Sequence, residues 1–180
     1  VELGMSTSNV DLAMSTIYAA NRSRVDPTAP RAFLVRDPVR FAVAGLPAHV
    51  EVGRHPDDPA MGVRTIAITD AVVLEPADVP AEGSRVWLKG AGCVRREAEQ
   101  LVATDEPIDV VRSGAVDVVH WAPAGGRPVR LETPDGPVSG VAPRPLTAVE
   151  EDTVVQFERV GFARIDAQGP SRTVAYFAHR

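Results

Sequence analysis

Residues 129–141, VRLETPDGPVSGV, contain a strong hairpin signal. Residues 129–132 alternate apolar and polar side chains, as in a half-buried strand, and Thr133-Pro134-Asp135-Gly136 then predicts a turn. Short alternating runs separated by turn residues continue on both sides of this segment. We expect strands at residues 39–43, 49–52, 65–68, 71–74, 85–89, 93–96, 116–121, 129–132, 154–159, 162–165 and 173–177. Because no helical pattern separates these runs, the predicted fold is all-β, with two antiparallel β-barrels.

The first 25 residues have a different pattern. One apolar stripe at helical spacing is formed by Val10, Met14, Ile17 and Tyr18. Ser8 stands three residues before Asp11, which predicts an N-terminal cap, and Asp26-Pro27 ends the helix because the residue before a proline avoids helical dihedrals. A single amphipathic helix with no partner helix has little to pack on. We therefore expect the chain to begin partway through a larger protein.

Composition narrows the class of protein. The net charge of −5 argues against gripping nucleic acid by bulk charge, although local recognition stays open. A lone Cys93 excludes a disulfide scaffold and favours a reducing, cytoplasmic setting, and no apolar run of 18 residues predicts a membrane span. The chain has 18 arginines and one lysine, Lys89. This excess is explained either by a GC-rich genome or by a lysine-poor acidic surface suited to high salt.

Local motifs for catalysis or metal binding are weak. The sequence has neither of the common glycine-rich phosphate loops, and Gly90-Ala91-Gly92 is interpreted as a bulge inside a strand pair. The four histidines, at positions 49, 55, 120 and 179, lack the spacing of a metal site. Cys93 lies among apolar residues and is interpreted as a small buried hydrophobe. Taken alone, these motifs predict a β-barrel binding module with no catalytic or metal-ligating residues.

Longer strings carry a family resemblance. In order, they are DPTAPRAF (26–33), VRDPV (35–39), HPDDPAMGVR (55–64), VHW (119–121) and VQFERVGF (155–162). These strings resemble the C-terminal, anticodon-binding half of archaeal-type glutamyl-tRNA synthetases, which are glutamate–tRNA ligases, and of their sister family, the glutaminyl-tRNA synthetases. Agreement in five ordered motifs over residues 26–162 is far more specific than any one motif.

The resemblance implies a proximal barrel made from segments on both sides of an inserted distal barrel. Proline-rich stretches at 75–80 and 142–145 bracket a unit that fits this layout. We expect a helical tail of the catalytic half at 1–30, a proximal barrel from 31–80 plus 150–180, and a distal barrel at 81–149.

The resemblance also implies a function. The full-length parent would be a class I aminoacyl-tRNA synthetase that attaches glutamate to tRNA-Glu using ATP, with tRNA-Gln as an open second substrate. The family's HIGH and KMSKS motifs are not in these residues, so we expect a fragment that binds tRNA but is inactive alone. ATP and Mg would belong to the absent catalytic half, which would be its partner in the same chain. We expect a monomeric, cytoplasmic protein with no membrane partner.

Five residues are the candidate RNA-binding positions. Those matching the family's pocket for the central anticodon uridine are Arg31, Gln156 and Arg159. An amide offers both a donor and an acceptor to uracil, and arginines reach carbonyl and phosphate oxygens. At the strand that reads the first anticodon base, the matching positions are Trp87 and Lys89; a buried core tryptophan is the alternative for Trp87. Residues 79–84 lack the basic residues with which the family reads the third base.

Two alternatives to this function remain. The first is a free-standing β-barrel that binds ribosomal RNA, because the distal barrel resembles ribosomal proteins that bind 5S RNA; the helix and the DPTAPRAF string count against it. The second is a β-barrel hydrolase with an unrecognised site. The pair His120-Trp121 is interpreted as structural rather than RNA-contacting, and the loop around His55 as a turn of the proximal barrel.

Overall fold

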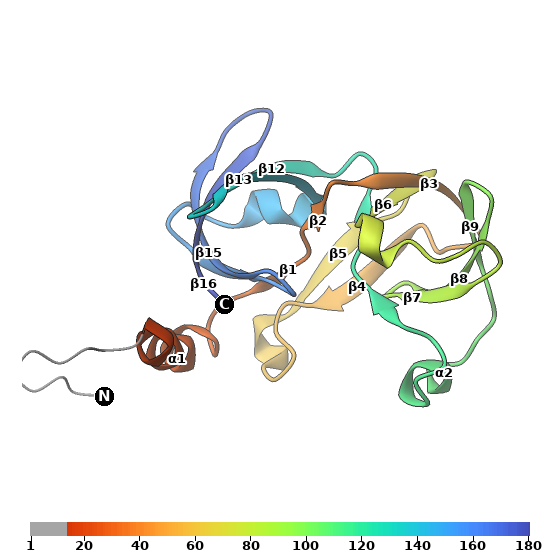
Figure 1. The fold of residues 1–180 in the computed structure, drawn as a ribbon, viewed down its shortest axis with the longest axis horizontal. Coiled ribbons are helices and arrows are strands. Elements are labelled where there is room, and N and C mark those ends of the chain that lie inside the picture. The colour runs from red at the N-terminus through yellow and green to blue at the C-terminus, as the bar shows by residue number, and fades with distance from the viewer. Residues whose placement is uncertain (1–13) are drawn as a thin grey trace, which may run out of the picture.

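The chain folds mostly into β-strands that curl into two half-barrels (Figure 1). The computed structural model describes residues 14–180. Helix α1 (Met14–Val25) precedes the strands, and a single-turn helix α2 (Asp109–Arg112) lies between two of them. Three further connections contain the 3₁₀ turns η1 (Pro59–Met61), η2 (Pro76–Asp78) and η3 (Arg144–Ala148). The predicted all-β class with a short N-terminal helix is confirmed.

The first half-barrel, sheet A, contains the C-terminal strands. In sheet order its strands are β1 (Arg31–Ala32), β14 (Val154–Phe157), β15 (Gly161–Gln168), β16 (Thr173–His179), β12 (Arg127–Thr133), β13 (Gly136–Ala142) and β2 (Val35–Arg36). The predicted turn at 133–136 joins β12 to β13, and the Thr133 hydroxyl donates to the Gly136 carbonyl at 2.6 Å. Gly136 has φ of 113°, a value that side chains with a Cβ rarely adopt.

The second half-barrel, sheet B, contains most strands of the middle of the chain. In sheet order they are β10 (Val118–Val119), β7 (Arg85–Leu88), β8 (Gly92–Glu97), β9 (Gln100–Ala103), β3 (Val39–Ala44), β6 (Ala71–Leu74) and β11 (Ala122–Pro123). A separate hairpin, β4 (His49–Gly53) with β5 (Val63–Ala67), alternates exposed and buried residues throughout.

The predicted bulge at residues 90–92 is wrong. These glycines belong to the hairpin turn between β7 and β8, where Leu88 pairs with Gly92 and the Ala91 N–H donates to the Leu88 carbonyl at 2.8 Å. Gly90 has φ of 79°, and a Cβ there would lie 2.7 Å from a methyl of Val52. The turn therefore needs glycine both for its backbone conformation and for its close approach to β4.

The half-barrels combine antiparallel and parallel strand pairs. Four strand pairs are parallel: β1 with β14, β12 with β16, β7 with β10, and β3 with β9. In each pair the partners are separated in the sequence by other strands, so the pairing arises where a sheet curls and distant segments meet. Parallel strands can usually be predicted from a helical pattern between them, because a helix commonly connects them. Here other strands lie between the paired strands, so the sequence has no such pattern.

Three clusters of buried apolar residues share one short segment. Phe33 lies in the core of sheet B, Leu34 in the core of sheet A, and Val35 in a small cluster between β2, β6 and β11. All three side chains are at most 2% exposed. The segment crosses from one half-barrel to the other and anchors both.

Several sequence predictions concern boundaries. Helix α1 ends at Val25, directly before Asp26-Pro27, whereas the predicted cap at Ser8 and Asp11 lies outside the described residues. The division into proximal and distal barrels stays a prediction. The sheets group strands differently, since 127–142 lies in sheet A and 39–44 and 71–74 lie in sheet B. Among residues 14–180, no helix has the length and apolar character needed to cross a membrane.

Candidate nucleic-acid interface

The pairing of β1 with β14 joins distant parts of the chain. Arg31 lies directly opposite Gln156 in this parallel pair, and the Gln156 N–H donates to the Pro30 carbonyl at 3.0 Å. The pairing of β1 with the C-terminal strand β14 therefore places two of the predicted RNA-binding residues side by side.

Arg31 is buried and paired. Its residue is 9% exposed, and Nη2 lies 2.9 Å from the Asp26 carboxylate at the end of α1. Together with Arg54 and Arg64, Arg31 lines a cavity of about 30 Å³, which has room for about two water molecules. That space is too small for a base. The half-buried Gln156 is therefore the more accessible member of the pair.

Glu158 is the centre of an ionic cluster between the sheets. Its carboxylate accepts a hydrogen bond from Lys89 Nζ, and it lies 3.5 Å from His120 Nε2 and 3.7 Å from Arg64 Nη2. Burial by itself would raise the pKa of Glu158, but hydrogen bonds from His120 and Lys89 and their positive charges outweigh it and lower the pKa to about 2. The predicted RNA contact Lys89 is thus an ion-pair partner of sheet A in this structure.

Arg64 and His120 both pack on the ring of Phe33. The guanidinium of Arg64 lies 4.4 Å from the ring centroid, and the His120 ring stacks at 4.7 Å with an angle of 14° between the planes. Arg64 is 6% exposed, and none of its three guanidinium nitrogens has a hydrogen-bond partner among the described residues. Burial lowers the pKa of Arg64 to about 10, partly opposed by the charge of Glu158.

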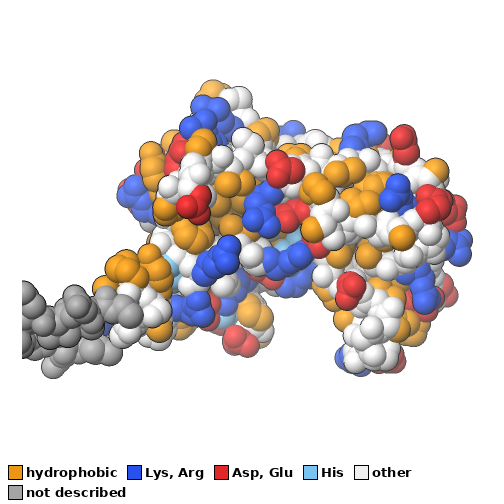
Figure 2. Space-filling model, viewed as in Figure 1, with side chains coloured by type: hydrophobic (Ala, Val, Ile, Leu, Met, Phe, Trp, Pro, Cys, Tyr) orange, Lys and Arg blue, Asp and Glu red, His pale blue; other side chains and the backbone are white. Residues whose placement is uncertain are grey.

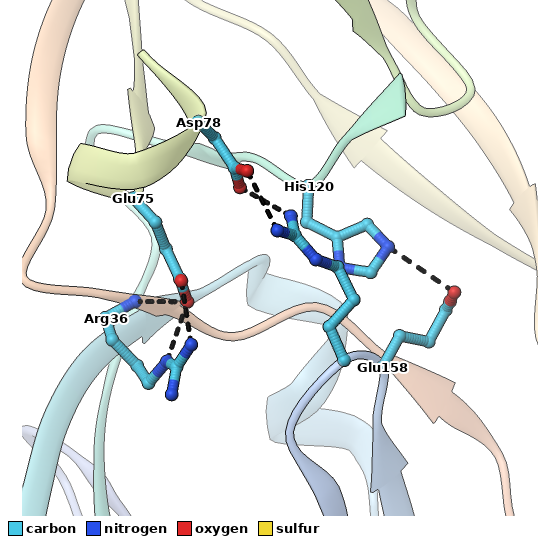
Figure 3. A network of polar contacts seen from close by, with 6 residues as sticks. Arg36, Glu75, Asp78, His120 and Glu158 are labelled. Carbon is cyan, nitrogen blue, oxygen red and sulfur yellow. Dashed lines mark hydrogen bonds and ion pairs between the residues drawn. The ribbon is translucent and has the colours of Figure 1, made fainter. Parts of the chain in front are cut away.

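Two further arginines of sheet A pair with carboxylates at η2 (Figure 3). Arg159 donates to both oxygens of Asp78, at 2.5 and 2.9 Å, and Arg36 donates to both oxygens of Glu75, at 2.9 Å each. Hydrogen bonding to these carboxylates raises the pKa of both arginines. Arg159 also has φ of 67°, in the left-handed region that non-glycine residues rarely occupy. The arrangement fixes the direction of the Arg159 side chain.

Arg159 lies between two surface grooves. One, the η2 groove, has a volume of about 520 Å³ and runs between η2 and the strands β7 and β10. The other, the α1 groove, has a volume of about 510 Å³ and runs between α1 and the β12–β13 hairpin. Both volumes fall within the range of small-molecule sites, so each groove is large enough for a nucleotide.

Trp87 lies on β7, and Lys89 directly follows this strand. Their neighbours Val86 and Leu88 are buried, at 6% and 0% exposed, whereas Trp87 is half-buried and the Lys89 side chain is 40% exposed. Trp87 is not among the residues of the three core clusters.

The other tryptophan, Trp121, and His55 have structural contacts. Trp121 is fully buried, and its Nε1 donates to the Lys89 carbonyl at 3.0 Å. His55 Nδ1 accepts from the Asp57 N–H at 3.1 Å, and the opposite nitrogen lies 2.9 Å from the Asp26 carbonyl. These contacts agree with the structural roles predicted for the His120-Trp121 pair and for the loop around His55.

Some of the basic side chains lie close together in the view of Figure 2. Figure 2 shows Lys and Arg atoms along the middle of the view, over the region where Figure 1 places β1, β2 and β5.

Sequence reasoning missed the carboxylates that hold the basic residues. Glu158 lies inside the QFER string and Asp78 inside a proline-rich stretch, but Asp78 and Arg159 are 81 positions apart. Neither acid stands in a local sequence pattern from which its basic partner could be predicted. The resemblance pointed to the arginines, and only the folded chain reveals the acids.

Comparisons with known proteins show which family this chain resembles. Residues 29–112 match the model of the anticodon-binding domain of class I tRNA synthetases (E and Q). The chain is 56% identical over 180 residues to a glutamate–tRNA ligase of Natronomonas pharaonis and 48% identical over 188 residues to that of Haloarcula marismortui, with 99% of this chain covered in both. A glutamate–tRNA ligase of Methanosarcina acetivorans is 36% identical over the whole chain. The chain spans 32% of the length of each of these relatives.

Proposed function

We propose that this chain, whose residues 29–112 belong to the family of anticodon-binding domains of class I tRNA synthetases for glutamate and glutamine, reads the anticodon of tRNA-Glu as part of a glutamate–tRNA ligase. The relatives that carry this name match along the full length of the chain. None of them supports the alternative of a free-standing protein that binds ribosomal RNA.

The observation that carries the proposal is the side-by-side placement of Arg31 and Gln156. A carboxamide supplies both a donor and an acceptor, the pattern that matches the O4 and N3–H edge of uracil. The cavity beside Arg31 is too small for a base, so the uridine would lie over the more exposed Gln156. Arg31, on the neighbouring strand, would hold Gln156 in place.

The remaining candidates have supporting roles in this proposal. Arg159 is held by Asp78 at the rim of both grooves, from which it reaches a base or a phosphate. Trp87 on β7 is half-buried, and an unstacked base would lie against its exposed part. Lys89 gives up its bond to Glu158 or shares it when a phosphate approaches.

We also propose the setting in which the chain works. The parent ligase attaches glutamate to tRNA using ATP and Mg, both bound by a catalytic part outside these 180 residues, and it acts as a monomer in the cytoplasm. This chain then contributes recognition of the tRNA and no catalytic residue.

The test is binding of anticodon stem-loop RNA to the 180-residue chain at fixed salt, with the central uridine present or replaced by cytidine. We expect the unmodified chain to discriminate by about tenfold or more, and Gln156→Glu, which replaces an amide donor with an acceptor, to lose most of that discrimination. Arg112→Ala removes an exposed arginine of α2 and is the control. Equal binding of both RNAs by the unmodified chain would overturn the proposal.

A further inference from the structure

Arg64 is a buried cation whose hydrogen-bond donors neither the fold nor the proposed function uses. It ends the string HPDDPAMGVR and lies on β5, where it is 6% exposed. All three guanidinium nitrogens are buried without a hydrogen-bond partner among residues 14–180. Glu158 lies 3.7 Å away but accepts its hydrogen bond from Lys89 instead. A buried charge of this kind is costly unless an acceptor reaches it.

Arg64 faces an enclosed space that two other arginines share. It lines the cavity of about 30 Å³ together with Arg31 and Arg54, and this cavity lies between β1, β5 and η3. The remaining walls are apolar side chains, among them Phe33 and Leu146. Among the described residues, no carboxylate, hydroxyl or amide side chain lines the cavity. The side chains around it therefore offer hydrogen-bond donors and no acceptor.

The positive charges around the cavity are only partly matched by carboxylates. Asp26 pairs with Arg31, at 2.9 Å from Nη2. Arg54 donates to a backbone carbonyl at 3.2 Å and has no carboxylate partner in the part of the chain that the structure describes. Burial lowers the pKa of Arg64 to about 10, and the nearby charge of Arg54 acts in the same direction. These two guanidinium groups repel each other, and a negative charge in the cavity would relieve that repulsion.

The size of the cavity restricts what can bind there. A volume of about 30 Å³ is far below that of sites for organic ligands. A water molecule between the arginines would need acceptors for its own hydrogens, whereas a halide accepts from every donor. We infer that this cavity binds one small inorganic anion of the chloride class, held by hydrogen bonds from Arg64 and by the charge of Arg54. Without the anion, Arg64 keeps only its contacts with Glu158 and Phe33.

Chloride NMR tests the site in solution, because chloride that exchanges with a protein-bound site has a broadened line. The unmodified chain is titrated into sodium chloride beside Arg64→Met and Arg40→Met, which remove a buried and an exposed arginine. We expect Arg64→Met to weaken chloride binding about tenfold or more, through loss of charge-assisted hydrogen bonds, and Arg40→Met to leave it unchanged. Equal broadening by the two variants would overturn the inference.

Bromide diffraction keeps the inference testable if Arg64→Met folds poorly, because it uses the unmodified chain. Crystals are soaked in sodium bromide, and the anomalous signal of bromine locates the bound ion. We expect a bromide in the cavity, within hydrogen-bonding distance of Arg64 and beside Arg54. A cavity without bromide, in crystals that bind the ion at surface arginines alone, would overturn the inference. Neither measurement involves RNA, so the anion site and the proposed function can fail separately.

Discussion

Glu158 makes ionic contacts with three basic side chains: Arg64 of β5, Lys89 directly after β7, and His120 directly after β10. Because its pKa in the folded chain is about 2, below the ordinary value of 4.5, its contribution to stability is fully present above about pH 5 and is lost as the pH falls towards 2. We expect Glu158→Gln to lower the free energy of unfolding by about 2 kcal/mol at pH 7 and by much less near pH 3. Urea unfolding at both pH values measures this difference.

Glu99→Gln is the matched control, because Glu99 is exposed on the β8–β9 turn. This variant should follow the unmodified chain at both pH values. A Glu158→Gln deficit that stays constant from pH 7 to pH 3 would mean that the carboxylate is not the group that titrates.

For Arg64, unlike Glu158, the cost of burial outweighs the favourable contacts of the charged group. Its guanidinium is buried without a hydrogen bond, so its desolvation is opposed only by Glu158 at 3.7 Å and by the face of Phe33. We expect Arg64→Met, which keeps the length and apolar stem, to be as stable as the unmodified chain or more stable by about 1 kcal/mol. Thermal unfolding measures the change, with exposed Arg40→Met as the control. A loss above about 2 kcal/mol would show that the guanidinium is well bonded in solution.

At the scale of elements, the link between β11 and β12 depends on a single glycine. A Cβ on Gly126 would lie 2.5 Å from the Ala142 carbonyl oxygen and 2.9 Å from that of Pro123, and backbone atoms cannot move aside cheaply. The neighbouring Gly125 has nothing within 4 Å of an added Cβ. We expect Gly126→Ala to cost about 1–3 kcal/mol and Gly125→Ala to change stability little. Denaturant midpoints of the two variants test the contrast, and equal midpoints would contradict it.

Strands were predictable where alternation and β-branched residues coincide. Residues 71–74 were predicted with the observed limits of β6, and 39–43 within one residue of β3. By contrast, β13 contains Pro137, Ser139 and Gly140, and the two-residue strands β1 and β2 are too short to show a period. Such strands exist because tertiary pairing supplies their partners, which no local pattern reveals.

Part of the candidate site could likewise be predicted from the sequence, and part could not. Motif strings located Arg31, Gln156 and Arg159, and the pairing of β1 with β14 sets the first two side by side. The paired acids were not predictable, because an ion pair between sheets depends on the folded path and not on spacing. The same holds for the α1 groove, whose walls come from opposite ends of the described chain.

At the scale of the whole molecule, the two half-barrels share one chain segment and several ion pairs. Phe33, Leu34 and Val35 each belong to a different core cluster. Separating the two sheets would therefore expose at least one of these buried side chains. The pairs Arg159–Asp78 and Lys89–Glu158 add polar links across the same boundary. Sub-global unfolding of one sheet would expose residues that the other sheet needs, which favours a single cooperative transition.

Phe33→Ala tests this cooperativity directly. Removing a fully buried ring from the core of sheet B should cost about 3–5 kcal/mol, and the loss should appear equally in both sheets because they unfold together. Hydrogen exchange measured through a urea series should give one common midpoint for residues 85–103 of sheet B and 129–142 of sheet A, lower than in the unmodified chain. Phe177→Ala, which removes a half-buried ring from sheet A, should produce a smaller shift that is again common to both segments. If 129–142 kept its original midpoint while that of 85–103 fell, the half-barrels would be independent units joined by a passive linker.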